Sequence, residues 1–227
     1  KRYVFTWDKK RFPDAKSMLN QLKKRGLGIV ANIKPALLQD HPKFLSVAES
    51  EGFLKKPAGD PAISQFWGGP GAHVDFTSPT ARIWWKNQLK AEVLVKGIDS
   101  AWNDNNEYEV DDDDAQAAGE GFPFPAKQAL PLKALLMTRT SVEAQQELHP
   151  KLRIYSVTRA GCPGIQRWAE TWTGDNQTSW HTLRWNIANG LSLAISGMGR
   201  MGHDIGGFSG ERPEPELLVR WFQAMAL

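Results

Sequence analysis

The sequence has little cysteine and no long uncharged apolar run, and each absence excludes a class of protein. The single cysteine, Cys162, cannot form an intramolecular disulfide, so the chain is not a disulfide-stapled domain. No segment approaches the roughly 20 consecutive apolar residues of a membrane-spanning helix, so we expect no membrane partner. Residues 1–8 are mixed and polar and carry no secretory signal. One cysteine and no signal in this segment favour a cytoplasmic location.

The sequence also lacks a concentrated charge of one sign. The formal net charge is +3, and the basic runs Lys9–Arg11 and Lys23–Arg25 fall at an expected turn and helix end, where cations are common. A nucleic-acid-binding protein typically gathers Lys and Arg on one face with interleaved aromatic residues. We therefore expect no nucleic-acid partner.

Motifs for metals and organic cofactors are missing as well. The acidic run Asp111–Asp114 lacks the glycine of a calcium-binding EF-hand loop, and no histidine pair has the spacing of a zinc protease. Gly197–Gly202 matches G-x-G-x-x-G, but a polar loop follows it where a dinucleotide site needs a helix. We expect no metal and no cofactor.

Apolar and aromatic residues, by contrast, are plentiful. Of the 227 residues 41% are hydrophobic, which is enough for one sizeable core, and ten are tryptophan. Tryptophan fills core volume, but its flat ring also stacks on the apolar faces of sugars. Both interpretations stay open from composition alone.

Helical and extended patterns alternate along the chain. Periodicity and capping residues predict helices over 13–25, 79–97, about 132–142, parts of 176–195 with a break at Gly190, and from Glu214 onward. Short apolar runs predict buried strands at Leu27–Ile33, Gly97–Trp102 and Leu152–Thr158, with a glycine-rich strand and loop at 197–208. The segment after Pro35, with Trp67–Gly71 at its tip, and an insertion near 109–125 are expected to be loops.

This β-α-β order predicts parallel strands with helices outside, hence an α/β barrel or a doubly wound sheet. We interpret residues 1–227 as a single segment with the insertion near 109–125. Both folds place functional residues where strands end. Polar residues do follow the expected strand ends, at Asn32–Lys34, Asp104–Glu107, Arg159 and His203–Asp204.

Two carboxylates are candidates for chemistry. Asp104 follows a strand end among amides that could hold it ionised and aimed, as a nucleophile requires, although an acidic turn is the alternative. Asp175 follows Trp172 near a helix start, where it could instead be an N-cap. Two carboxylates at separate strand ends are the minimum equipment for cleaving a glycosidic bond.

Taken together, the ordered motifs resemble those of glycoside hydrolase family 31, the α-glucosidase and α-transglucosylase family. The resemblance covers nearly the whole chain. The matching blocks are Phe5–Asp8 with Phe12–Asp14, Asn32–Pro35, Asp75–Pro79, Trp84–Trp85, Gly97–Asp99, Trp102–Glu107, Thr158–Arg159, Arg167–Trp168, Trp172–Asn176 and Gly202–Phe208.

The resemblance implies a (β/α)8 TIM-type barrel and a retaining double displacement. It implies that Asp104 is the nucleophile and Asp175 the acid/base, with their carboxyl groups about 5–5.5 Å apart. The remaining residues that it places in or beside the sugar site are Arg167, Asp204, Trp102, Trp172, Arg159, Lys34 and His203, with Glu107 in support.

Two departures from the family pattern stand out. Asn105 occupies the position after the nucleophile where the family usually has Met, which affects the neighbouring subsite. The chain also looks incomplete, with roughly strands 3 to 7 of the barrel, and an open parallel sheet with unpaired edges is prone to association, so an oligomer is one expectation.

The sequence therefore predicts a glycosidase: a retaining α-glycoside hydrolase or transglycosylase acting on α-glucosides or short α-glucans. Its expected partner is an α-linked oligosaccharide or an α-glucoside. The alternative is a non-catalytic sugar-binding or inactive fragment of such an enzyme, which a turnover assay would distinguish.

Overall fold

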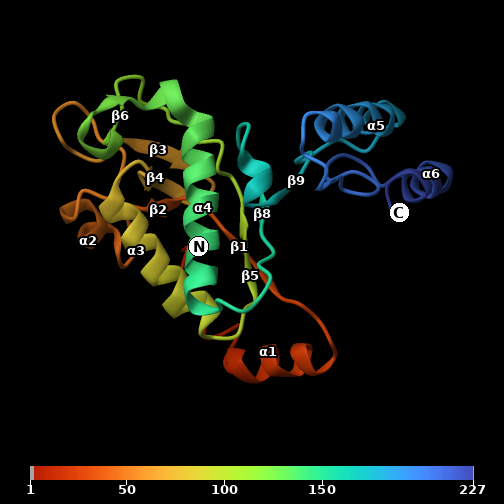
Figure 1. Ribbon diagram of the computed structural model, residues 1–227, viewed down its shortest axis with the longest axis horizontal. Helices are drawn as coiled ribbons and strands as arrows, with labels where there is room; N and C mark the ends of the chain where they lie inside the picture. The colour runs from red at the N-terminus through yellow and green to blue at the C-terminus, as the bar shows by residue number, and fades with distance from the viewer. Residues whose placement is uncertain (1–2, 227) are drawn as a thin grey trace. The chain divides into compact units, whose positions relative to one another are not determined.

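The computed structural model describes residues 3–226, apart from the side chain of residue 129 (Figure 1). The chain divides into two compact units, the first ending at Cys162 and the second beginning at Pro163. Both units contain parallel strands connected through helices, so the α/β interpretation is confirmed.

The first unit contains a parallel sheet in the order β1-β5-β8. Its strands are β1 (Val30–Ile33), β5 (Ser100–Asn103) and β8 (Val157–Thr158). The helices of this unit are α1 (Ala15–Lys24), α2 (Phe44–Glu49), α3 (Pro79–Leu89) and α4 (Leu130–Leu148). Asn32 lies opposite Trp102, and Trp102 lies opposite Val157, so the polar ends of the three strands meet at one edge.

The strands are shorter than the apolar runs predicted. The run Leu27–Ile33 was expected to form one buried strand, but only Val30–Ile33 is a strand and only Ile33 in it is buried. Likewise, Leu152–Thr158 contributes only its last two residues. Within the described sheet, β1 pairs with a neighbouring strand on one side only, so it is not enclosed. The apolar residues of the run therefore predicted more burial than the strand has.

The segment after Pro35 is not the loop that we expected. It forms a three-stranded antiparallel sheet in the order β2-β4-β3. Its strands are β2 (Ala36–Leu38), β3 (Ile63–Phe66) and β4 (Gly69–His73). The predicted tip is confirmed in part, because Trp67 and Gly68 form the turn between β3 and β4, whereas Gly69–Gly71 belong to β4. Buried Leu37, Val47 and Phe53 supply the packing that the sequence pattern did not reveal.

Capping residues mark the two helices that frame this unit. Asp14 accepts a hydrogen bond from the Ser17 amide at the start of α1, and Ser78 does so from the Ala81 amide at the start of α3. Helix α3 then passes into a π-helical turn, η1 (Lys90–Leu94), which the sequence did not predict. Helix α4 packs against both α3 and β5.

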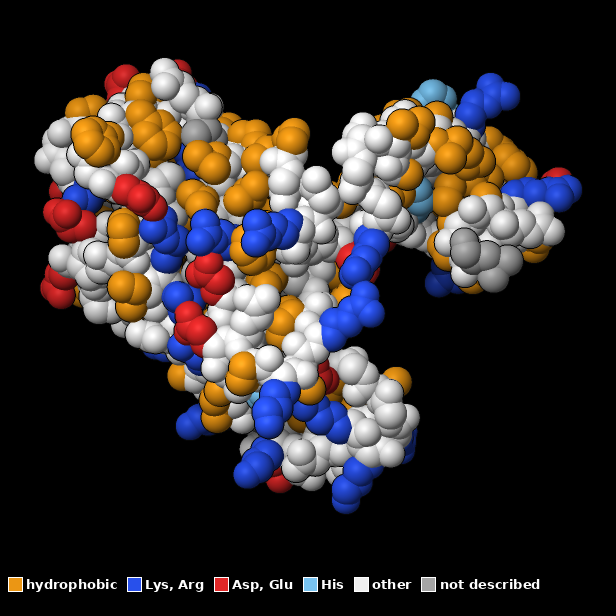
Figure 2. Space-filling view, viewed as in Figure 1, with side chains coloured by type: hydrophobic (Ala, Val, Ile, Leu, Met, Phe, Trp, Pro, Cys, Tyr) orange, Lys and Arg blue, Asp and Glu red, His pale blue; other side chains and the backbone are white. Residues whose placement is uncertain are grey.

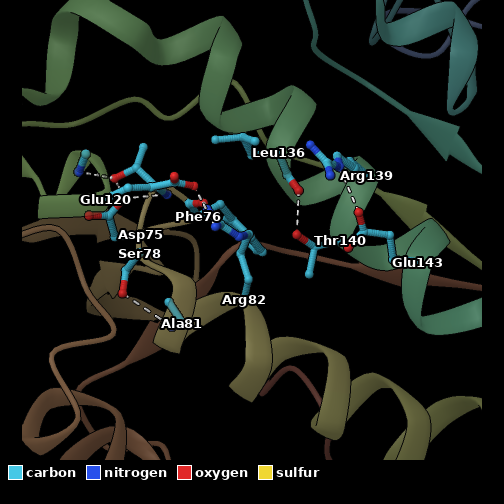
Figure 3. A network of polar contacts seen from close by, with 12 residues as sticks. Asp75, Phe76, Ser78, Ala81, Arg82, Glu120, Leu136, Arg139, Thr140 and Glu143 are labelled. Carbon is cyan, nitrogen blue, oxygen red and sulfur yellow. Dashed lines mark hydrogen bonds and ion pairs between the residues drawn. The ribbon is translucent and has the colours of Figure 1, made fainter. Parts of the chain in front are cut away.

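The insertion near 109–125 is mostly irregular, as expected, but it is anchored. It contains β6 (Gln116–Ala117), η2 (Gly119–Gly121) and β7 (Phe124–Pro125), followed by η3 (Ala126–Ala129). Buried Asp75 accepts hydrogen bonds from the amides of Thr77 and Ala118, at 3.0 and 2.6 Å. Figure 3 shows Arg82 of α3 reaching to the Phe76 carbonyl and the Glu120 carboxylate, at 2.8 and 2.7 Å. The insertion is therefore fixed to the start of α3.

The second unit contains η4 (Ile165–Arg167), β9 (Glu170–Trp172), α5 (Trp180–Ile195), β10 (Met201–Gly202) and α6 (Pro215–Met225). Strands β9 and β10 pair in parallel, with Trp172 opposite Gly202. The predicted final helix is confirmed as α6, whereas β9 was not predicted.

One prediction about α5 was wrong, and one alternative is excluded. The helix does not break at Gly190, because this glycine serves close packing: a Cβ there would lie 3.2 Å from His203 Nε2 and from Met201 Sδ. The helix begins at Trp180 with Ser179 as its cap, so Asp175 is not an N-cap and lies in the loop between β9 and α5.

Exposed side chains differ in kind over the surface in Figure 2. Lys and Arg gather over α1 and the residues before it, whereas hydrophobic side chains cover much of α5, among them Trp180, Trp185, Leu191 and Ile195. Among residues 3–226, no helix combines the length and apolarity needed to cross a bilayer.

Candidate active site

Asp104 lies directly after β5, at the edge where the strands of the first unit end. Its amide donates to the Ile33 carbonyl of β1 at 2.9 Å, so strand pairing itself fixes the backbone at this position. The residue is only 8% exposed. A carboxylate this buried requires compensating partners, because removal from water disfavours the charged form.

Two of those partners converge on one oxygen of Asp104. Oδ2 accepts hydrogen bonds from Lys34 Nζ at 2.6 Å and from Asn32 Nδ2 at 2.9 Å. Burial raises the pKa of the carboxyl, but the hydrogen bonds from Lys34 and Asn32 and the Lys34 charge outweigh it, so the net pKa is lowered. Asp104 is therefore held ionised.

The other oxygen, Oδ1, is buried without a hydrogen-bond partner among the described residues. The guanidinium of Arg159 faces it, with Nη1 3.7 Å away. The Arg159 amide donates to the Asn103 carbonyl at 2.9 Å, and its Nε donates to the carboxylate of Glu107. Glu107 thus holds the guanidinium of Arg159 in place.

A buried polar layer beneath Asp104 fixes the ends of β5 and β8. Asn103 accepts from Ser141 Oγ at 2.8 Å and donates to the Val157 carbonyl at 3.1 Å. Ser141, on α4, in turn accepts from the indole of Trp85 on α3 at 3.0 Å. The register of Asp104 therefore depends on both helices that cover the sheet.

Asn106 completes this layer on the side of β8. Its amide nitrogen donates to Thr158 Oγ1 at 2.9 Å, and its oxygen accepts from the Ala160 amide at 2.9 Å. Asn105, between Asn106 and Asp104, has a left-handed backbone with φ of +47°. Its side-chain oxygen accepts a hydrogen bond from Lys34. The side-chain amides of Asn103 and Asn106 are thus structural, which explains much of the polar run in the sequence.

Trp67 is a site neighbour that sequence reasoning missed. The ring lies at the tip of the β3–β4 turn and is 74% exposed, with Lys34 Nζ 5.9 Å from its centroid. The available signal was a tryptophan followed by two glycines at a loop tip, which gave no indication that the tip folds back to the end of β1. Trp102 lies on β5, within the strand that the sequence predicted, and is half-buried.

In the second unit, Asp175 lies in a loop held by neighbouring amides and hydroxyls. Asn176 donates to Thr173 Oγ1 at 2.8 Å and to Asn186 Oδ1 of α5 at 2.9 Å. The Asn176 carbonyl accepts from the amides of Phe208 and Ser209, at 2.8 and 3.1 Å. The loops after β9 and β10 are therefore joined.

The glycine pair after β10 permits this junction. Gly207 has φ of +86°, and a Cβ there would lie 2.7 Å from the backbone nitrogen of Thr178. Only glycine combines this backbone with such close approach. The hydroxyl of Thr178 also donates to the Gly206 carbonyl at 2.9 Å, which tightens the contact.

The remaining candidates of the second unit lie as follows. His203 Nδ1 is 3.1 Å from Thr173 Oγ1, and burial lowers the pKa of its imidazole. Asp204 follows His203 and its carbonyl accepts from the Gly207 amide. Trp172 ends β9 and is half-buried. Arg167 is exposed, with its guanidinium 5.1 Å from the ring of Trp168. The structure thus brings His203 to the loop of Asp175.

Within residues 3–226, no three or more His, Cys, Asp or Glu side chains are arranged to hold a metal ion. The candidates instead form two clusters, around Asp104 in the first unit and around the Asp175 loop in the second.

The chain is similar to several α-glucosidases. It is 32% identical to α-glucosidase 2 of Bacillus thermoamyloliquefaciens and 33% identical to a probable glucan 1,3-α-glucosidase of Arabidopsis thaliana, matching 98% and 100% of this chain. It spans 29% and 25% of the length of those relatives.

Solved structures match its fold as well. The glucosidase II α subunit in its alpha3-Glc2-bound form has a TM-score of 0.87 and 29% identity over 97% of this chain and 25% of that one. A family 31 α-xylosidase from a soil metagenome, in complex with xylose, has a TM-score of 0.87 and 26% identity over 98% of this chain and 33% of that one. The family model described as "Glycosyl hydrolases family 31 TIM-barrel domain" matches residues 1–227. The chain therefore belongs to glycoside hydrolase family 31 and is part of its (β/α)8 barrel.

Proposed function

We propose that this chain carries the reaction centre of a retaining α-glycosidase that acts on α-glucosides or short α-glucans. Asp104 is the nucleophile and Asp175 the acid/base. The observation that carries the proposal is the state of Asp104: a buried carboxylate at a strand end, kept ionised by Lys34 and Asn32. An acidic turn would leave the carboxylate in water and would need no such partners.

The reaction proceeds in two displacements. In the first, a lone pair of the Asp104 carboxylate forms a bond to the anomeric carbon while the bond to the leaving oxygen breaks, and that oxygen takes a proton from Asp175. In the second, a water or sugar hydroxyl attacks the same carbon and gives its proton to Asp175. The bond to Asp104 then breaks and its electron pair returns to the carboxylate. Two inversions leave the α configuration unchanged.

Further residues bind and shape the sugar. Arg167 binds hydroxyls of the cleaved sugar, and Asp204 orders that subsite with His203 beside it. Trp102, Trp172 and Trp67 offer aromatic faces to the apolar sides of sugar rings. Support for a glucose-type substrate comes from relatives called α-glucosidases and from the alpha3-Glc2-bound glucosidase II structure. Because another family 31 structure bears the name α-xylosidase, sugar identity is the first specificity to assay.

Covalent trapping tests the proposal directly. The full-length protein is incubated with a 5-fluoro glycosyl fluoride of the α-gluco series and digested, and the labelled peptide is identified by mass spectrometry. We expect the label on Asp104 and an α-configured first product by NMR. A label on Asp99 or in Asp111–Asp114 would move the nucleophile elsewhere. An unlabelled protein that binds α-glucosides without turnover would instead support the non-catalytic sugar-binding alternative.

Two expectations about the cellular setting stay predictions. A cytoplasmic location, which the single cysteine favours, is tested by fractionation of the source cells. Self-association is tested by light scattering of the full-length protein. Among the relatives, glucosidase II is described as a heterodimer of a catalytic subunit with the binding domain of a regulatory subunit.

A further inference from the structure

The two oxygens of Asp104 have different surroundings, and the difference has consequences for the reaction. Oδ2 accepts from Lys34 at 2.6 Å and Asn32 at 2.9 Å. Oδ1 accepts no hydrogen bond among the described residues, and Arg159 Nη1 stays 3.7 Å from it. An oxygen whose lone pairs are engaged by two donors is a poorer nucleophile than one whose lone pairs are open.

The cation that engages Oδ2 is itself fixed. Lys34 follows β1, where the peptide of Pro35 stiffens the chain, and its ammonium also donates to the side-chain oxygen of Asn105. The centroid of the Trp67 ring lies 5.9 Å from the same ammonium. With 28% of its side chain exposed, Lys34 is screened less than a surface lysine. It therefore acts on Asp104 as a fixed charge.

We propose that Lys34 is a positioning residue that, with Asn32, holds Oδ2 of Asp104, so that Oδ1 is the attacking atom and the Lys34 charge serves breakdown of the glycosyl-enzyme. The inference rests on the proposed function, because it assigns roles within the double displacement. This role for Lys34 differs from the one that the family resemblance implied, in which the side chain lines the sugar-binding site.

The direction of the effect follows from the charge on Asp104 in each state. The carboxylate is fully negative in the resting enzyme, partly negative in both transition states and neutral as the glycosyl ester. Lys34 therefore stabilises the resting enzyme most and the ester least. Formation of the ester weakens the contact, and breakdown of the ester strengthens it.

Removal of the Lys34 charge therefore has opposite consequences for the two steps. Breakdown loses stabilisation only in its transition state, so it slows. Formation loses more stabilisation in its starting state than in its transition state, so it does not slow at neutral pH. The glycosyl-enzyme then accumulates, which lowers kcat and KM together and leaves kcat/KM nearly unchanged.

The test is Lys34→Met in the full-length protein, assayed with an aryl α-glucoside whose good leaving group makes breakdown limiting. We expect kcat to fall about 10- to 100-fold, as for loss of one charge-assisted hydrogen bond, with KM falling in parallel and a burst of aryl alcohol. Lys34→Arg should recover most of kcat. Asn32→Ala, which removes a neutral donor from the same oxygen, should act in the same direction but less.

The pH profile supplies a second readout. Lys34 and Arg159 are the cations that face Asp104, with Glu107 behind Arg159. Because Lys34 lowers the pKa of Asp104, its loss should move the acid limb of kcat/KM to higher pH in Lys34→Met but not in Lys34→Arg. Lys43→Met is the matched control: its side chain is 32% exposed and pairs with Glu92, so both limbs and both rate constants should stay as in the wild type.

A crystal structure of the trapped 5-fluoro glycosyl-enzyme locates the bond. We expect it on Oδ1, with Lys34 and Asn32 still donating to Oδ2. A bond on Oδ2, or a Lys34→Met variant whose kcat/KM falls as far as kcat without a burst or a shifted limb, would overturn the inference. Both results presuppose a wild-type enzyme labelled at Asp104, so failure of the proposed function itself would be seen first.

Discussion

The two candidate carboxylates are held in different ways. Asp104 is fixed through its side chain, by a lysine and an amide that converge on one oxygen. The loop of Asp175 is fixed by hydrogen bonds from the amides of Phe208 and Ser209 to the carbonyl of Asn176, and by the Asn176 side chain, which donates to Thr173 and Asn186. A nucleophile has to stay ionised and aimed, so a permanent charge beside it is useful. A group that exchanges protons at each step needs a defined position, which the hydrogen bonds of its loop can supply.

The packing around the two clusters differs too. The first unit has a large buried cluster that includes Phe53, Phe76, Trp85 and Met137. In the second unit, the buried cluster among the described residues consists of Leu183, Leu217 and Trp221, and α5 exposes several apolar side chains. Since each fully buried large side chain contributes about 1.5–3 kcal/mol, the first unit has the larger hydrophobic stabilisation.

The sharpest test of the comparison replaces each carboxylate. Asp104→Asn should lower kcat by about 10⁴-fold and abolish covalent labelling, because the amide cannot form the ester. Asp175→Asn should lower kcat by about 10²–10⁴-fold with a poor leaving group, and much less with an activated aryl leaving group, while labelling persists. Asp114→Asn, in the exposed part of the insertion, is the control. Equal losses with both leaving groups would contradict the roles.

The first unit should also carry an acid-sensitive element. His73 is buried, its Nε2 donates to the Glu109 carbonyl at 3.2 Å, and burial lowers the pKa of its imidazole to about 4. The unfolded chain takes up this proton below a pKa of about 6.5, but the folded chain does so only near 4. The stabilisation that neutral His73 contributes is therefore complete above pH 6.5. As the pH falls toward 4, the free energy of unfolding decreases by about 3 kcal/mol.

The loss is measured by urea unfolding at several pH values. Unfolding is monitored by tryptophan fluorescence, to which the buried Trp85 contributes. In His73→Gln the same fall in pH should cost about 3 kcal/mol less, whatever the absolute stability of the variant. An unchanged pH slope would show that His73 is not the titrating group.

A backbone test is expected to affect the second unit alone. Gly207→Ala forces a Cβ into the backbone of Thr178 at a φ of +86°, so it should cost about 1–3 kcal/mol and detach the loop of Asp175. Gly199→Ala is the matched control, since a Cβ there meets nothing within 4 Å. Hydrogen exchange of the Phe208 and Ser209 amides reports the loss locally. Equal protection in both variants would mean that the loops are not joined there.

The smallest effects come from matched helix caps. Ser78 caps α3 in the first unit with a distance of 3.4 Å, and Ser179 caps α5 in the second at 3.0 Å. Replacement of either serine by alanine should cost about 1 kcal/mol. Hydrogen exchange should rise in the first turn of the affected helix, and more for Ser179→Ala because its hydrogen bond is shorter. The reverse order would indicate that burial of Ser78 matters more than cap geometry.

Local patterns predicted the elements well where neighbours in the sequence decide them. Ser78 caps α3 directly before the predicted helix start at Pro79, and Trp67 lies at the tip of its turn. Predictions failed where distant contacts decide. Helix α5 continues through Gly190, which packs closely against His203. The segment after Pro35 forms a sheet because buried side chains such as Phe53 hold it together.

The sequence by itself determined the family, the β-α order and the position of Asp104 after a strand, because these follow from residue order and short-range periodicity. Only the tertiary structure decided how Asp104 is held. Lys34 is 70 residues away along the chain and reaches Asp104 because β1 pairs in register with β5. Such a contact depends on strand register and helix packing, which bring together groups that no local pattern relates. The asymmetry between the two oxygens of Asp104 is a product of that register.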